Sequence, residues 1–224
     1  MHVAEIWRYP VKSMGGERLT EINIGPLGLD GDRIVHVEDA RGRIVTARTR
    51  PKLLGLHASL GSDGEPLIDG RPWTDPAIAA AVVTAAGAGT RLVRDDIDRP
   101  FDILPLLVAT DGAIAAFGYD GRRLRPNLVI GGVPGLEERT WEGQHLQIGT
   151  LLIELVDLRG RCVMTTFDPD TLAQDLNVLR NIVQRFDGTL ALNARVLEPG
   201  RVRQGDRVEL LAGRPAGIGS PRSS

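Results

Sequence analysis

The only cysteine of the chain, Cys162, lies in a segment whose residue types could bind a metal or act as a nucleophile. It follows the most apolar strand candidate, residues 151–156, and Arg159 and Arg161 precede it. Positive charge beside a cysteine favours the thiolate, which is both a nucleophile and a soft metal ligand. A lone cysteine can also be an inert buried residue, but two neighbouring arginines argue against an apolar burial site. The segment therefore indicates chemistry at Cys162.

Three arginines stand at the ends of other strand candidates, beside turn residues: Arg33, Arg48 and Arg125. Arg125 opens the rigid sequence Arg-Pro-Asn, which leads into a strand. A guanidinium binds phosphate or carboxylate through two parallel hydrogen bonds, so these positions could converge on an anion. Each of them, taken singly, is more often a solvated surface residue, and sequence spacing alone does not show convergence.

The sequence Tyr-Pro-Val-Lys-Ser at residues 9–13 is a third segment of interest. Its proline ends a strand candidate, and Lys12 and Ser13 follow at a turn. Such a turn could bind an anion, although composition alone favours an exposed hairpin loop.

Several other chemistries find no support in the sequence. It has no glycine-rich phosphate-binding loop, no Cys-x-x-Cys pair and no Gly-x-Ser-x-Gly elbow. The histidines are scattered without ligand spacing, which argues against a zinc site: they are His2, His36, His57 and His145. No histidine flanks Cys162 as the base of a cysteine hydrolase, although a distant one could fold onto it.

Composition predicts a globular protein of one large domain or two small ones. The 224 residues are 42% hydrophobic and 25% charged, enough to bury a core without disulfides. A net charge of −2 sets up no general basic field for nucleic acid. No apolar run approaches the ~18 residues of a membrane span, and the N-terminus lacks the pattern of a signal peptide. We therefore expect a cytoplasmic protein without nucleic-acid or membrane partners.

The pattern along the chain is typical of a mainly β protein with a few helices, of the β-barrel type. Short alternating or apolar runs end at Gly, Pro, Asp or Asn, and predict strands at 3–9, 19–24, 34–37, 44–47, 54–60, 91–93, 106–109, 128–130, 146–148, 151–156, 190–196 and 207–211. A hairpin turn is expected at 39–42. Three helices are predicted: 76–86 after Asp75, a short one capped by Thr110 or Asp111, and a stripe from Leu172 to Val183.

Five segments, in this order along the chain, together resemble MOSC-domain proteins that carry an additional N-terminal barrel domain. They are YPVKS at 9–13, GLDGDR at 28–33, VTARTRP at 45–51, RPNLVI at 125–130 and RCVMTTFDPDT at 161–171. This family includes the mitochondrial amidoxime-reducing component and its bacterial relatives. The resemblance extends to about Leu211.

The resemblance implies a site for molybdenum cofactor (molybdopterin), a pterin with a dithiolene and a phosphate. Cys162 matches the catalytic cysteine that ligates the metal. The positions that match the pterin and phosphate site are Lys12, Ser13, Arg33, Arg48, Thr110, Asp111, Arg125, Asn127, Arg161 and Asn193. Gly112, after Asp111, departs from the usual pattern of the family.

The resemblance also implies two domains, an N-terminal MOSC-associated β domain at 1–95 and a MOSC domain at 100–212. The polar stretch 95–102 would separate them, and the Gly-, Pro- and Ser-rich residues 213–224 are expected to be a disordered tail. The two domains should share an interface that holds the site.

The implied activity is a molybdenum-dependent reduction of small N-hydroxylated or N-oxide compounds. The cysteine set of a ferredoxin-like domain is missing from the sequence, so a separate electron donor of the ferredoxin, flavoprotein or cytochrome type is expected. The alternative is a cofactor carrier or sulfur-transfer protein that uses Cys162 without reductase activity. Pyridoxal phosphate binding has little support, because it needs a Schiff-base lysine and only Lys12, assigned to phosphate, and Lys52 exist.

Overall fold

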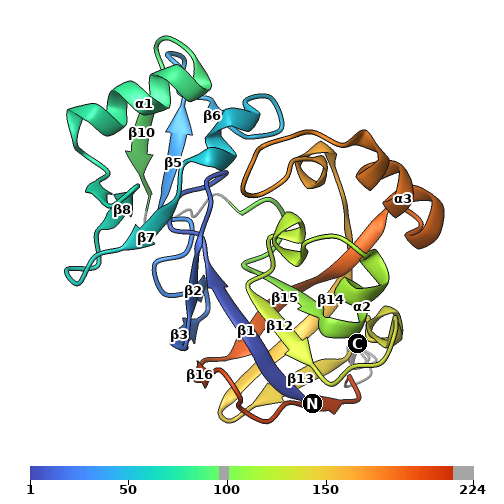
Figure 1. The fold of residues 1–224 in the computed structure, drawn as a ribbon. Coiled ribbons are helices and arrows are strands. Elements are labelled where there is room, and N and C mark those ends of the chain that lie inside the picture. The colour runs from blue at the N-terminus through green and yellow to red at the C-terminus, as the bar shows by residue number, and fades with distance from the viewer. Residues whose placement is uncertain (96–100, 214–224) are drawn as a thin grey trace, which may run out of the picture.

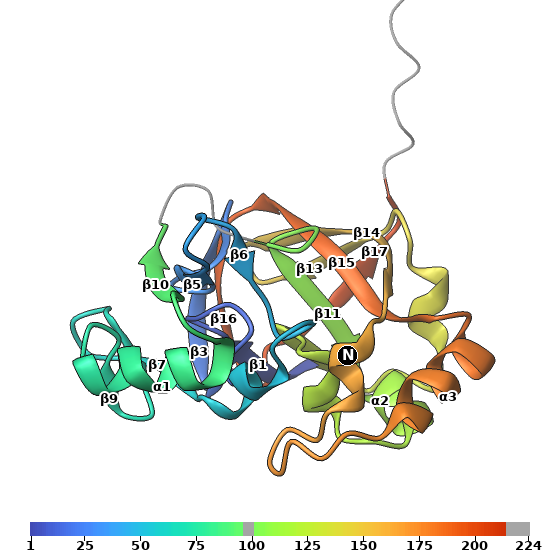
Figure 2. The ribbon, with the colours of Figure 1, turned by 90° about the horizontal axis from the view of Figure 1, so that it is seen from above.

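The computed structural model describes residues 1–95 and 101–213, and it is a mainly β protein with two lobes (Figure 1). Part of the predicted linker, residues 96–100, and the predicted tail after Gly213 lie outside the described residues. Seen from above, α1 lies on one side of the molecule, and α2 and α3 lie on the other (Figure 2). The predicted fold class is therefore confirmed.

The large lobe is built on one eight-stranded sheet. Its strand order is β17 (Glu209–Leu211), β13 (His145–Ile148), β14 (Leu151–Gly160), β15 (Thr189–Glu198), β11 (Leu106–Thr110), β12 (Leu128–Gly131), β1 (His2–Arg8) and β2 (Glu17–Leu19). Only β11 and β12 run parallel; the other neighbours in this sheet are antiparallel. Alternate side chains of these strands form the main hydrophobic core.

Two α-helices and three short 3-10 helices complete the large lobe. They are α2 (Asp111–Phe117), η2 (Gly121–Leu124), η3 (Glu137–Thr140), η4 (Val163–Thr166) and α3 (Leu176–Phe186). Phe117, Ile182 and Phe186 form a second buried cluster between α2 and α3. Leu124 of η2 belongs to the same cluster, so this packing fixes the helix that directly precedes Arg125.

The small lobe covers residues 35–94 and has its own core. Its elements are β5 (Val35–Glu38), β6 (Ile44–Val45), η1 (Pro51–Gly55), β7 (Ala58–Leu60), β8 (Pro66–Ile68), β9 (Arg71–Pro72), α1 (Pro76–Ala86) and β10 (Arg91–Arg94). α1 begins after Asp75, whose side chain accepts a hydrogen bond from the Ala77 N–H at 2.8 Å. Ile78 and Val82 on its buried face pack into the core of this lobe.

A small sheet packs on the large lobe, and the segment after β1 reaches the small lobe. A three-stranded sheet pairs β16 (Gly200–Arg203) with β3 (Glu21–Gly25), which pairs with β4 (Gly28–Leu29). β1 lies in the large sheet, and the residues directly after it run beside the small lobe, where Val11 forms a parallel bridge with Val35. Residues 9–13 therefore lie where the lobes meet.

The strands β4, β8, β9 and β16 were not predicted, and three predicted elements differ in detail. The strand expected at 19–24 is divided at Thr20, because β2 pairs with β1 whereas β3 pairs with β16. The strand expected at 54–60 begins only at Ala58, because the helix η1, which starts at Pro51, extends to Gly55. Leu172 lies outside α3, with φ at 59°, and the helix begins only after its cap Asp175.

The packing around Gly16 gives a test of this arrangement. A Cβ at Gly16 would lie 2.4 Å from the Arg8 carbonyl oxygen and 2.5 Å from Cδ1 of Tyr9. We expect Gly16→Ala to lower the free energy of unfolding by about 1–3 kcal/mol, the usual cost of overpacking. Gly25→Ala is the matched control, because its Cβ meets nothing within 4 Å, and it should stay within about 0.5 kcal/mol of the wild type. Equal urea midpoints for the two variants would contradict the packing described.

Candidate functional site

A cavity of about 330 Å³ lies between the lobes and is lined by residues of both. Its volume is in the range of small-molecule sites. Most of the residues predicted for the site line it: Lys12, Ser13, Arg33, Arg48, Arg125, Asn127, Arg161, Cys162 and Asn193. The structure thus brings together side chains that are more than 100 positions apart in the sequence.

Backbone hydrogen bonds position the side of the cavity that comes from the N-terminal half. The Lys12 N–H donates to the Val35 carbonyl at 2.8 Å, and the Arg33 N–H donates to the Tyr9 carbonyl at 2.8 Å. Ser13 and Arg33 have left-handed backbone, with φ of 70° and 52°, which non-glycine residues seldom adopt. This backbone places Lys12 and Arg33 in the cavity.

Arg125 and Asn127 form the opposite side. Arg125 follows η2 with φ at 56° and precedes Pro126, which restricts the chain on entry to β12. Asn127 is fully buried; its Oδ1 accepts from the Leu107 N–H at 3.1 Å, and its Nδ2 donates to the Trp7 carbonyl at 3.3 Å. Asn127 therefore ties β1 to β11 beside the cavity.

Cys162 is half-buried between the end of β14 and the start of η4. Its backbone is extended, and its carbonyl accepts from the N–H and the Oγ1 of Thr165, at 3.0 and 2.8 Å. The thiol thus has a place on the cavity wall that the first turn of η4 fixes. In the described part of the chain, no group of three or more His, Cys, Asp or Glu side chains is arranged to hold a metal ion.

The cavity is strongly basic. Its basic lining residues are Lys12, Arg33, Arg48, Arg123, Arg125, Arg159 and Arg161, and its acidic one is Asp102. Burial lowers the pKa of Arg161 to about 10 and shifts the pKa of Arg125 in the same direction. Within residues 1–95 and 101–213, neither arginine forms an ion pair, and Nε of Arg161 is buried without a hydrogen-bond partner.

These unpaired charges define what the cavity can hold. Removing a cation from water without supplying a counter-ion is destabilising, and Arg125 and Arg161 are half-buried. An anion with several oxygens would therefore satisfy groups that the chain leaves unsatisfied. A phosphate fits this set of donors, because guanidinium groups bind it through paired hydrogen bonds. The residues present therefore fit a phosphate-bearing cofactor with a metal close to the Cys162 sulfur.

Asp102 is the cavity residue that sequence reasoning missed most clearly. Its carboxylate pairs with Lys12 Nζ at 2.7 Å, Arg159 at 3.1 Å and Arg48 at 3.2 Å. Burial alone would raise its pKa, but the Lys12 hydrogen bond and the neighbouring positive charges lower it to about 2. Asp102 falls at the end of a stretch that composition marks as a linker, so no local signal distinguishes it.

Arg123, Arg159 and Met164 also line the cavity without having been assigned to the site. Arg123 pairs with Asp168 at 2.9 Å, and Arg159 donates to Asn193 Oδ1 at 3.3 Å. Their partners become neighbours only through the fold. The position of Arg159 beside the cysteine motif was the one signal that could have found it.

Thr110 and Asp111, which were also predicted for the cofactor site, do not line the cavity. Thr110 Oγ1 accepts from the Ala113 N–H at 3.1 Å and donates to Glu138 at 3.1 Å. Asp111 accepts from the Gly132 N–H at 2.7 Å. Both residues cap and anchor α2 at the end of β11 opposite Leu106 and Leu107, which do line the cavity.

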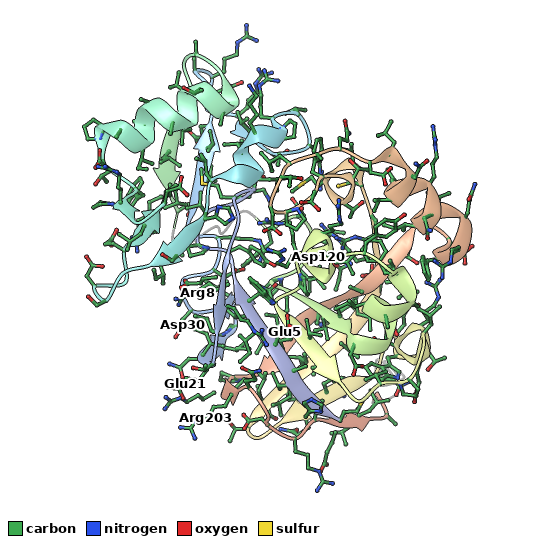
Figure 3. The ribbon with its side chains drawn as sticks, in the orientation of Figure 1. Glu5, Arg8, Glu21, Asp30, Asp120 and Arg203 are labelled. Carbon is green, nitrogen blue, oxygen red and sulfur yellow. The ribbon has the colours of Figure 1, made fainter. Side chains whose placement is uncertain are left out.

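Charged residues outside the cavity form ordinary surface pairs. Glu21 and Arg203 lie at the outer edge formed by β3 and β16, and their side chains pair at 2.9 Å (Figure 3). Such exposed pairs contribute little to stability. Arg125 and Arg161 in the cavity differ from these surface charges, because they are half-buried and have no ion-pair partner among the described residues.

The fold and the site define a two-lobed, β-rich protein with a basic cavity and one cysteine between its lobes. Two family models match this chain: the MOSC N-terminal beta barrel domain over residues 1–98 and the MOSC domain over residues 112–209. The chain belongs to the MOSC-domain proteins that carry this N-terminal domain.

Two curated relatives are amidoxime-reducing components. The chain is 26% identical to mitochondrial amidoxime-reducing component 1 of Homo sapiens, over 93% of this chain and 82% of that protein. It is 25% identical to mitochondrial amidoxime reducing component 2 of Macaca fascicularis, over 75% of this chain and 67% of that protein. The YuaD protein from Bacillus subtilis has a similar fold, with a TM-score of 0.54 at 12% identity, over 95% of this chain and 96% of that one.

The low pKa of Asp102 predicts an acid-sensitive contribution to stability. A carboxyl whose pKa is lower in the folded than in the unfolded chain stabilises the fold above its ordinary pKa. That contribution is lost as the pH falls from about 4, the ordinary value, through about 2. We expect Asp102→Asn to be less stable than the wild type at pH 6 and the difference to shrink below pH 4, as measured by urea unfolding. A difference that is constant from pH 6 to pH 3 would contradict this.

Proposed function

We propose that this chain binds molybdenum cofactor (molybdopterin) and is an oxidoreductase that reduces small N-hydroxylated or N-oxide compounds. The observation that carries the proposal is a basic cavity with a cysteine on its wall, in which two half-buried arginines, Arg125 and Arg161, have no ion-pair partner among the described residues. Membership of the MOSC family and the names of the amidoxime-reducing relatives support the cofactor and the substrate class.

In this proposal different side chains bind different parts of the cofactor. Lys12, Ser13, Arg33 and Arg125 would hold the phosphate and pterin, since they supply ammonium, hydroxyl and guanidinium donors from opposite sides of the cavity. Cys162 would ligate the metal through its sulfur. When bound, the cofactor supplies a metal centre that accepts and donates electrons.

The chain's own residues would control access and charge around that centre. Asp102 keeps Lys12, Arg48 and Arg159 in fixed positions through its ion pairs. Arg48, whose side chain is 48% exposed, and Ile103, 57% exposed, lie where the cavity opens to solvent. A small substrate would enter there, and a separate cytoplasmic electron-donor protein of the ferredoxin, flavoprotein or cytochrome type would supply the electrons.

The second candidate function is that of a cofactor carrier or sulfur-transfer protein. It is favoured by the partial exposure of Cys162, which leaves the sulfur accessible from an open cavity. A carrier needs the same anion-binding groups, so geometry alone fits both functions. Turnover distinguishes them.

Metal content and benzamidoxime reduction, measured on one preparation, test the proposal. We expect molybdenum in protein produced by a host that makes the cofactor, together with reduction of benzamidoxime by an artificial electron donor. Molybdenum without turnover would favour the carrier. Protein that neither retains molybdenum nor binds inorganic phosphate would contradict both functions.

The variant Cys162→Ser tests the metal ligand. Serine has nearly the same volume, so the fold and the melting temperature should change little. A hydroxyl is a poor ligand for a soft metal site, and we expect benzamidoxime reduction to fall by more than about 100-fold, beyond the usual effect of outer-shell changes. Phosphate affinity, set by Lys12 and the arginines, is the internal control and should be unchanged. A folded variant with wild-type turnover would remove Cys162 from the mechanism.

A further inference from the structure

The ring of Tyr9 contacts two of the cavity arginines. The guanidinium carbon of Arg125 lies 4.2 Å from the ring centroid, and that of Arg33 lies 5.5 Å from it. Both distances are within the ~6 Å at which an aromatic face attracts a cation. Arg33 and Arg125 line the cavity whereas Tyr9 does not, so the ring supports the guanidinium groups from behind.

Tyr9 is itself held by groups from both sides of the cavity. Its N–H donates to the buried Asp32 carboxylate at 2.7 Å, and its hydroxyl donates to the Pro126 carbonyl at 3.3 Å. Burial is the main cause that raises the pKa of Tyr9 to about 12, so the hydroxyl remains a donor. The ring is therefore fixed between the Asp32–Arg33 segment and the Arg125–Pro126 segment.

The charges around the ring explain why an aromatic residue suits this position. Arg33 pairs with Asp32, but Arg125 has no ion-pair partner among the described residues. Besides burial, the positive charge of Arg33 also lowers the pKa of Arg125, since the two groups repel each other. A carboxylate beside Arg125 would end this repulsion but would also compete with a bound anion. The ring stabilises the cations and leaves their charge and N–H donors to a ligand.

We propose that Tyr9 is a positioning residue whose aromatic face holds Arg33 and Arg125 at the spacing in which both bind one phosphate group. This inference rests on the proposed function, because it takes the cavity to be the site of a phosphate-bearing ligand. Tyr9 acts only through the two arginines and does not touch the ligand.

The electron density of the ring is the property to test. Tyr9→Phe keeps the aromatic face and loses only the hydroxyl, so affinity for inorganic phosphate, measured by calorimetry, should stay within about twofold of the wild type. Mono-, di- and trifluorophenylalanine at position 9 keep the shape but weaken the attraction for cations. We expect a stepwise loss of affinity that reaches about tenfold for the trifluoro variant, with nearly constant melting temperatures. Equal affinities across the series would overturn the proposal.

A double-mutant cycle identifies the groups through which Tyr9 acts. Tyr9→Leu, which keeps apolar bulk, should weaken phosphate binding by about tenfold, and this loss should largely vanish in an Arg125→Leu background. Additive losses would mean that Tyr9 acts through general packing and would contradict the proposal. If Tyr9→Leu does not fold, the fluorinated series decides the question, because it changes charge distribution without changing shape.

The wild type separates failure of this inference from failure of the proposed function. If the unmodified chain binds no phosphate, the anion site is absent, and both the proposed function and the role of Tyr9 are wrong. If the wild type binds phosphate but the fluorinated series is flat, only the role of Tyr9 is wrong.

Discussion

The concentration of partly buried positive charge in the cavity between the two lobes is the constraint on which the rest of the structure depends. Like charges repel, and burial removes the water that would screen them. The chain resists this repulsion with backbone hydrogen bonds that align residues 9–12 with residues 33–35 and with carboxylates that neutralise part of the charge, Asp32 and Asp102. Arg125 and Arg161 stay unpaired within the described residues, so the frame is built to be completed by an anion.

The shared strands make that frame rigid. β1 is a strand of the large sheet, whereas Val11 and Gly15, only a few residues later, form bridges with Val35 and His57 of the small lobe. β16, from the C-terminal end, pairs with β3 near the N-terminus. The relative position of Lys12 and Cys162 therefore follows from a continuous network of backbone hydrogen bonds. It does not depend on the contact between two separately folded surfaces, which would permit domain motion.

Sequence patterns predicted those elements that are determined by neighbouring residues, such as capped helices and alternating strands. Asp75, with Pro76 and Gly87, defined α1, and alternating apolar residues located most of the longer strands. The strands β4 and β9 have two residues each, too few to show the alternation of apolar and polar residues that marks a strand. Leu54 at the end of η1 and Leu56 just after it alternate as in a strand, so this pattern did not indicate a helix. The cavity residues on recognisable motifs were found. Asp102 was missed, and Thr110 and Asp111 lie outside the cavity, because a side chain's direction at a strand end depends on packing that only the fold supplies.

Backbone strain shows where the structure departs from what stability alone would select. Seven described non-glycine residues have positive φ, and three of them, Ser13, Arg33 and Arg125, line the cavity. Left-handed backbone in such residues is destabilising and persists where the surroundings enforce it, often at functional sites. Here each strained residue directs a donor into one space, and each belongs to a segment that the sequence singled out: the ends of YPVKS and GLDGDR, and the start of RPNLVI. The motifs thus encode a strained loop geometry as much as a set of side chains, so the arginines alone on relaxed loops would not form the site.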